Sequence, residues 1–170
     1  VSAPVIAVIL TMIFGGFLFL SMGKNPFEAI KLIFWDPIMS PTFSEYSRPQ
    51  LIIKAAPLIL IALGLSFGFR ANIWNIGAEG QYIMGALFSG SIGLALYPLD
   101  AWFIFPLMIL GGIIGGIFWA MIPAILKIKF NTNEILVSLM LVYVAEQILA
   151  LASVGFLRNP EGLGFPGSRD

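Results

Sequence analysis

The chain has 170 residues, of which 59% are hydrophobic and only 11% are charged, and its mean hydropathy is +0.96. A soluble domain carries about a quarter charged residues, so this composition indicates a polytopic membrane protein. The formal net charge of zero provides no basic face for nucleic acid. The sequence contains neither cysteine nor histidine, which excludes disulfides, thiol nucleophiles and histidine- or thiolate-ligated metal sites in these residues.

Five apolar stretches approach the roughly 20 residues that a helix needs to cross the hydrocarbon core. Their apolar residues run all round the helix, which is typical of a membrane span and not of an amphipathic soluble helix. We therefore expect an all-α polytopic transmembrane helix bundle. The expected spans are residues 3–22, 51–69, 81–97, 102–126 and 133–157, all in one transmembrane domain that covers residues 1–170.

A longer connection at residues 23–50 separates the first two spans. Pro26 suits the first turn of a short helix, and Asn25 suits the position that caps it. The apolar residues that follow are compatible with a helix lying in the membrane interface and equally with one packed on the spans.

The topology follows from the lysines. Lys127 and Lys129 occupy the short connection expected at residues 127–131, and short loops rich in Lys and Arg tend to be cytoplasmic. Counting spans backwards places Arg70 and the N-terminus inside and residues 23–50 outside.

Small residues recur four apart in the fourth span, where two such pairs overlap. This pattern lets another helix backbone approach closely, so it predicts tight packing but no particular function. The residues concerned are Gly111, Gly112, Gly115 and Gly116.

Residues 70–81 form a polar, glycine-rich segment between two uncharged runs, and we call this segment the polar island. Polar groups at membrane depth are costly and usually functional. One interpretation is a broken helix that lines a substrate path; the other is a short cytoplasmic connection before a span that starts at Gln81. Arg70 with Glu79 is a candidate ion pair under both. The candidate path residues are Asn75, Gly77, Glu79, Gly80 and Gln81.

Two further features concern the fifth span. Glu146 lies about 18 Å along the helix from Glu134, so it is either an acid that lines a pathway or a glutamate near the outer interface. Asn131, three residues before Glu134, is expected to cap this span. No catalytic constellation and no Walker A loop occur, so we expect no enzyme activity and no cofactor.

The run KAAPLILIALGLSFGFRANIWNIGAEGQ at residues 54–81 resembles the permease subunits of bacterial ABC importers for nucleosides and simple sugars. The distinctive element is NIGAEGQ at residues 75–81, supported by NEILVSLML at residues 133–141 and by the tail at residues 158–162. The chain departs from the family at Val142, where the family often has asparagine.

This resemblance implies the N-terminal half of a permease with the type II ABC importer fold, in the superfamily that includes ribose, galactose and branched-chain amino acid permeases. It further implies a multi-pass protein of the bacterial cytoplasmic (inner) membrane. The implied partners are a second permease subunit, cytoplasmic ATPase subunits that hydrolyse ATP, and an extracytoplasmic substrate-binding protein. Two other classes stay open: an ion-coupled secondary transporter or channel that uses Glu79 and Glu146, and a membrane scaffold that transports nothing.

Overall fold

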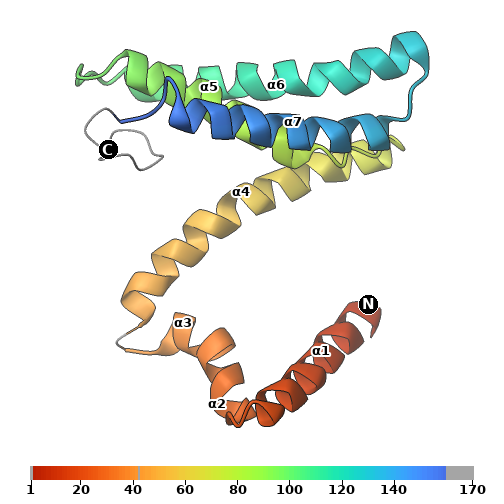
Figure 1. Ribbon diagram of the computed structural model, residues 1–170, viewed down its shortest axis with the longest axis vertical. Coiled ribbons are helices and arrows are strands. Elements are labelled where there is room, and N and C mark those ends of the chain that lie inside the picture. The colour runs from red at the N-terminus through yellow and green to blue at the C-terminus, as the bar shows by residue number, and fades with distance from the viewer. Residues whose placement is uncertain (1, 42, 160–170) are drawn as a thin grey trace. The chain divides into compact units, whose positions relative to one another are not determined.

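The structure is a computed structural model that describes residues 2–41 and 43–159, and every regular element in these ranges is helical. The chain divides into two compact units, Val1–Leu60 and Ile61–Asp170, and helix α4 (Ser44–Arg70) begins in the first and ends in the second (Figure 1). The two units are described separately below.

The first unit begins with α1 (Ser2–Ser21), which ends in a glycine turn. Gly23 has a φ of 70°, and the N–H groups of Lys24 and Gly23 donate to the carbonyls of Phe19 (2.9 Å) and Leu20 (3.0 Å). This pairing is the Schellman motif, which satisfies carbonyls that the helix end leaves free. The expected span at residues 3–22 is therefore a helix with nearly the expected bounds.

Three short helical elements follow: α2 (Pro26–Ile30), the π-helical turn η1 (Lys31–Trp35) and α3 (Asp36–Met39). Asn25 caps α2 by accepting a hydrogen bond from the N–H of Phe27 (3.1 Å), and Pro26 is the first helical residue. The predicted capped helix is confirmed.

Helix α4 starts at Ser44, well before the expected start at residue 51, so the expected connection at residues 23–50 is too long. Its 27 residues are about 40 Å long at 1.5 Å per residue, which exceeds the roughly 30 Å of a hydrocarbon core. Hydropathy marks only the apolar part of a helix. The polar first turns of α4 extend it beyond that part.

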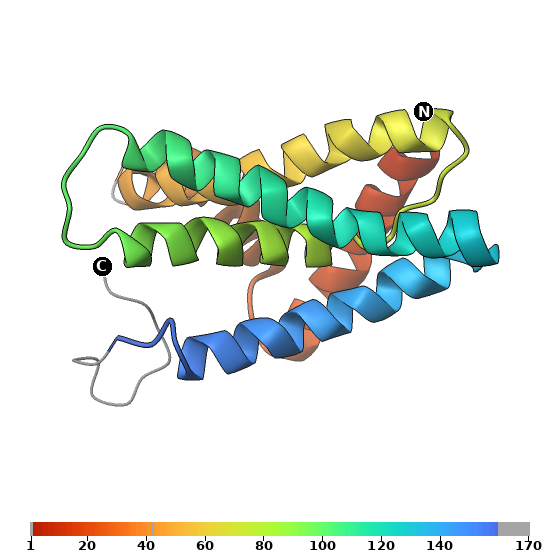
Figure 2. The same ribbon diagram turned by 90° about the horizontal axis from the view of Figure 1, so that it is seen from above.

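The second unit contains the C-terminal part of α4 together with α5 (Ala78–Ala95), α6 (Ile104–Phe130) and α7 (Glu134–Val154). Helix α5 packs along α6 and α7, as both views show (Figures 1 and 2). Its residues Met84 and Leu87 form the buried core with Trp119 of α6 and with Ala145 and Ala152 of α7.

Among the described residues, four helices are long and apolar enough to cross a membrane by length and composition: α1, α4, α6 and α7. Helix α5, expected as a further span, is not one of them. It has 18 residues, about 27 Å, and it carries Glu79, Gln81 and four glycines. Because α5 is covered by neighbouring helices, its surface need not be as apolar as a surface that faces lipid.

The end of α6 differs from expectation. The helix continues through Lys127 and Lys129 to Phe130, since positive charge is favourable at a helix C-terminus. Asn131 adopts a left-handed conformation (φ 49°) that ends α6, so it does not cap α7 as predicted. Asn133 is the cap instead, and its side-chain oxygen accepts from the N–H groups of Ile135 (3.0 Å) and Leu136 (3.4 Å).

Both glycine pairs of α6 lie against α5. A Cβ on Gly115 would lie 2.7 Å from the Phe88 ring and 2.9 Å from the Met84 carbonyl oxygen, and a Cβ on Gly111 would collide with Ile92. On the adjacent row, a Cβ on Gly112 would lie 3.4 Å from the carbonyl oxygen of Gly85, and one on Gly116 would lie 3.5 Å from that of Gln81. Small residues on α6 thus let the two helix backbones approach.

We predict that Gly115→Ala lowers the stability of the protein by about 1–3 kcal/mol, the usual cost of overpacking. The thermal unfolding midpoint of the purified protein in detergent measures this. Gly90→Ala is the matched control, because a Cβ there meets nothing within 4 Å. Equal midpoints for the two variants would contradict the close approach of α5 and α6.

Candidate functional site

The polar island is a connection between two helices and not a break within one. Helix α4 ends at Arg70, residues 71–77 are non-helical, and α5 begins at Ala78. Asn72 adopts a left-handed conformation (φ 58°), and the N–H groups of Ile73 and Asn72 donate to the carbonyls of Gly68 (2.9 Å) and Phe69 (3.1 Å). This is a second Schellman end, and it gives Asn72 a structural role.

Asn75 organises the next turn through both ends of its amide. Its oxygen accepts from the N–H of Gly77 (2.9 Å), and its nitrogen donates to the side-chain oxygen of Gln81 (3.2 Å). Both side chains are partly buried. The first turn of α5 and the chain that leads into it are therefore joined by an amide pair, Asn75–Gln81.

Helix α7 holds this turn from the other side. The hydroxyl of Ser138, which is 2% exposed, accepts from the N–H of Ile76 (3.3 Å) and donates to the carbonyl of Ile135 (3.1 Å). A Cβ on Gly77 would lie 2.7 Å from the carbonyl oxygen of Ser138, and one on Gly80 would lie 3.1 Å from Cα of Val142. The two glycines of the island are thus explained by contact with α7.

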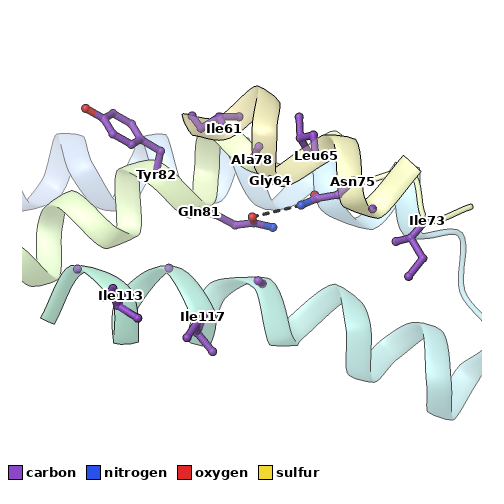
Figure 3. A pocket seen from close by; sticks show the side chains of 14 residues that line it. Ile61, Gly64, Leu65, Ile73, Asn75, Ala78, Gln81, Tyr82, Ile113 and Ile117 are labelled. Carbon is purple, nitrogen blue, oxygen red and sulfur yellow. Dashed lines mark hydrogen bonds between the residues drawn. The ribbon is translucent and has the colours of Figure 1, made fainter. Parts of the chain in front are cut away.

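A cavity of about 580 Å³ opens beside the amide pair, and we call it the upper cavity. Figure 3 shows the Asn75–Gln81 hydrogen bond at its wall. Apart from Asn75, Gln81 and Tyr82, its lining is aliphatic or glycine, and no charged residue contributes. The lining residues come from the end of α4, the island, α5 and α6, and include Gly64, Gly68, Gly112, Gly116, Ile113, Ile117 and Ala120.

A second cavity of about 320 Å³ is also lined by Asn75 and Gln81, and we call it the lower cavity. Its lining includes Trp74, Ser138 and the ion pair between Lys127 and Glu134, whose charged atoms lie 2.9 Å apart. This ion pair joins the last turn of α6 to the first turn of α7. The only charges on the lower cavity therefore neutralise each other within the described residues.

Two of the candidate path residues are carboxylates. The side chains of Glu79 and Glu146 are exposed, and neither lines the upper or the lower cavity. The buried residues of α7 are Ser138, Val142, Ala145 and Ala152, and Glu146 is not among them. In the part of the chain that the structure describes, Arg70 and Glu79 form no ion pair.

Sequence reasoning missed the roles of Ser138 and of the Lys127–Glu134 pair. A signal for the pair existed, since opposite charges flank a short connection between two helices. No local signal marks Ser138, because its partner Ile76 is 62 residues away in the sequence. The expected similarity of the tail at residues 158–162 lies largely outside the described residues.

We predict that Gly77→Ala destabilises the protein by about 1–3 kcal/mol, because its new methyl group meets the backbone of α7 and not a flexible side chain. The thermal unfolding midpoint measures the effect. Gly68→Ala is the matched control near the same connection, since its Cβ would make an ordinary 3.4 Å contact with the Ile73 carbonyl oxygen. If the two variants unfold at the same temperature, the island does not pack on α7 as described.

Comparison with known proteins places the chain among transport permeases. It is 33% identical to the glucose ABC transporter permease protein TsgB13 of Haloferax volcanii over 98% of the chain and 42% of that protein. It is 32% identical to the guanosine ABC transporter permease protein NupP of Bacillus subtilis over 84% of the chain and 39% of that protein. The nucleoside ABC transporter permease protein NupB of Lactococcus lactis is 28% identical over 85% of the chain and 38% of its own length.

The chain thus spans about two fifths of the length of these relatives. No solved structure matches it.

Residues 47–169, most of the chain, match a family of transport permeases. Together with the four apolar helices, this match makes the chain part of a multi-pass membrane protein. The chain belongs to the family described as the permease component of the branched-chain amino acid transport system.

Proposed function

We propose that the chain is part of the permease subunit of an ABC importer that moves a neutral polar solute, a nucleoside or a simple sugar, across the cytoplasmic membrane. The observation that carries this proposal is the uncharged upper cavity with an amide pair at its wall. Its volume of about 580 Å³ falls within the usual range for small-molecule sites. The names of the relatives, glucose and nucleoside permeases, support the same solutes.

The charge of the lining favours a neutral solute over an amino acid. A charged solute at membrane depth is favoured by charged side chains that replace the water around its ionic groups. The upper cavity offers amides and a tyrosine, and the charges of the lower cavity are already paired at 2.9 Å. Hydroxyl and nucleobase groups, by contrast, are well matched by amide side chains.

The family supports partnership with ATPase and substrate-binding components. We propose cytoplasmic ATPase subunits, a second permease subunit and an extracytoplasmic binding protein that delivers the solute. ATP binding and hydrolysis in the partners rock the permease between inward-open and outward-open states. In this scheme Asn75 and Gln81 border the path, while Gly77 and Gly80 brace its wall on α7.

An ion-coupled transporter would need carboxylates on the path. Glu79 and Glu146 lie outside both cavities, so these residues give that alternative no support.

We predict that the complete complex, reconstituted in vesicles with its ATPases and binding protein, takes up radiolabelled guanosine or glucose but not leucine. Uptake should require ATP and should persist with an uncoupler. Leucine uptake above that of both neutral solutes would contradict the neutral path. Uptake that an uncoupler abolishes while ATP is present would instead favour the ion-coupled class.

A further inference from the structure

The two cavities share one wall. Four residues line both the upper and the lower cavity: Ile73, Asn75, Gln81 and Ala120. Within the described residues, one hydrogen bond joins members of this wall, and it runs from the Asn75 amide nitrogen to the Gln81 amide oxygen. The amide pair therefore stands where one cavity would continue into the other.

We propose that the Asn75–Gln81 amide pair is the constriction of a single passage, and that a neutral solute with a neighbouring donor and acceptor replaces its hydrogen bond in transit. The inference rests on the proposed transport function for its solute. Whether the amide pair separates the two cavities can be tested without measuring transport. We call this separation the partition.

The side chain of Asn75 is held by more hydrogen bonds than that of Gln81. The oxygen of Asn75 is fixed by the N–H of Gly77, and the neighbouring Ile76 N–H is fixed by Ser138 on α7. The side chain of Gln81 has three rotatable bonds, and within the described residues it makes one side-chain hydrogen bond, to Asn75. Gln81 is thus the moving part and Asn75 the fixed part.

Small residues lie beside the pair. Ala120, which lines both cavities, contributes only a methyl group, and Gly116, which lines the upper cavity, contributes no side chain. When the pair parts, the Asn75 nitrogen becomes a free donor and the Gln81 oxygen a free acceptor. A solute that offers the complementary pair leaves neither group unsatisfied, which is the condition for polar groups away from water. Adjacent hydroxyls of a sugar and the edge of a nucleobase both meet it.

Thiol labelling tests the partition, because these 170 residues contain no cysteine and an introduced thiol reports on one position. In the complete permease, with any other cysteine replaced, Ala124→Cys marks the lower cavity and Ile117→Cys the upper one. A membrane-impermeant cationic methanethiosulfonate is added at the face that carries Lys127. We expect fast labelling at position 124 and slow labelling at position 117.

Loss of the Asn75–Gln81 hydrogen bond should change only the labelling rate at position 117. Gln81→Ala, and Gln81→Met as a variant that keeps the side-chain length, should each raise labelling at position 117 at least tenfold while position 124 keeps its rate. Tyr82→Ala is the matched control, since it removes a larger side chain that lines the upper cavity alone. The proposal is overturned if both Gln81 variants stay within twofold of the native rate, or if Tyr82→Ala gives the same increase.

Measurements of uptake then test whether the solute exchanges hydrogen bonds with the amide pair. Gln81→Met should lower initial uptake at least tenfold, measured in separate arms for guanosine and glucose to identify which solute the pair recognises. Glu79→Gln, two residues away and outside both cavities, should remain within twofold of the native rate. Equal losses in the two variants would overturn the exchange of hydrogen bonds. Absence of uptake in the native complex would refute the proposed function while leaving the labelling result to decide the partition.

Discussion

The site depends on one close contact, between the start of α5 and the backbone of α7. Gly77 and Gly80 lie so near Ser138 and Val142 that a methyl group at either position would press on backbone atoms. This approach brings the N–H of Ile76 to the Ser138 hydroxyl and thereby orients Asn75 toward Gln81. Without it the amide pair would have no fixed member, and the two cavities would not share a defined wall.

The same constraint explains the composition of α5. A helix that packs along two others needs small residues at its contacts and can carry polar residues. Helix α5 is accordingly less apolar than the four helices that are apolar enough to cross a membrane. Buried backbone groups at its N-terminus must still be satisfied. Just before the helix, Asn75 accepts from the N–H of Gly77 and Ser138 accepts from the N–H of Ile76, so polar side chains gather at this end.

The sequence alone predicted the helical class, most of the long apolar helices and the capped helix at Pro26. Hydropathy and local capping rules suffice for these because each depends on neighbouring residues. It did not predict that α4 starts at Ser44 or that Asn133, in place of Asn131, caps α7. It also did not predict that Glu79 lies outside both cavities. These depend on how helices end and pack, and the key partner of Ile76 is 62 residues away.

The central claim is that the polar island is clamped to α7 and so holds the amide pair in place. Hydrogen exchange resolved to single amides in the complete complex tests it most directly, with native protein compared with Ser138→Ala. We predict slow exchange at Ile76 and Gly77 in the native protein. Ser138→Ala should speed exchange at Ile76 about fivefold, the factor expected from about 1 kcal/mol, and should leave Gly77 slower than Ile76. Fast exchange at Ile76 in the native protein, or no change in the variant, would contradict the clamp.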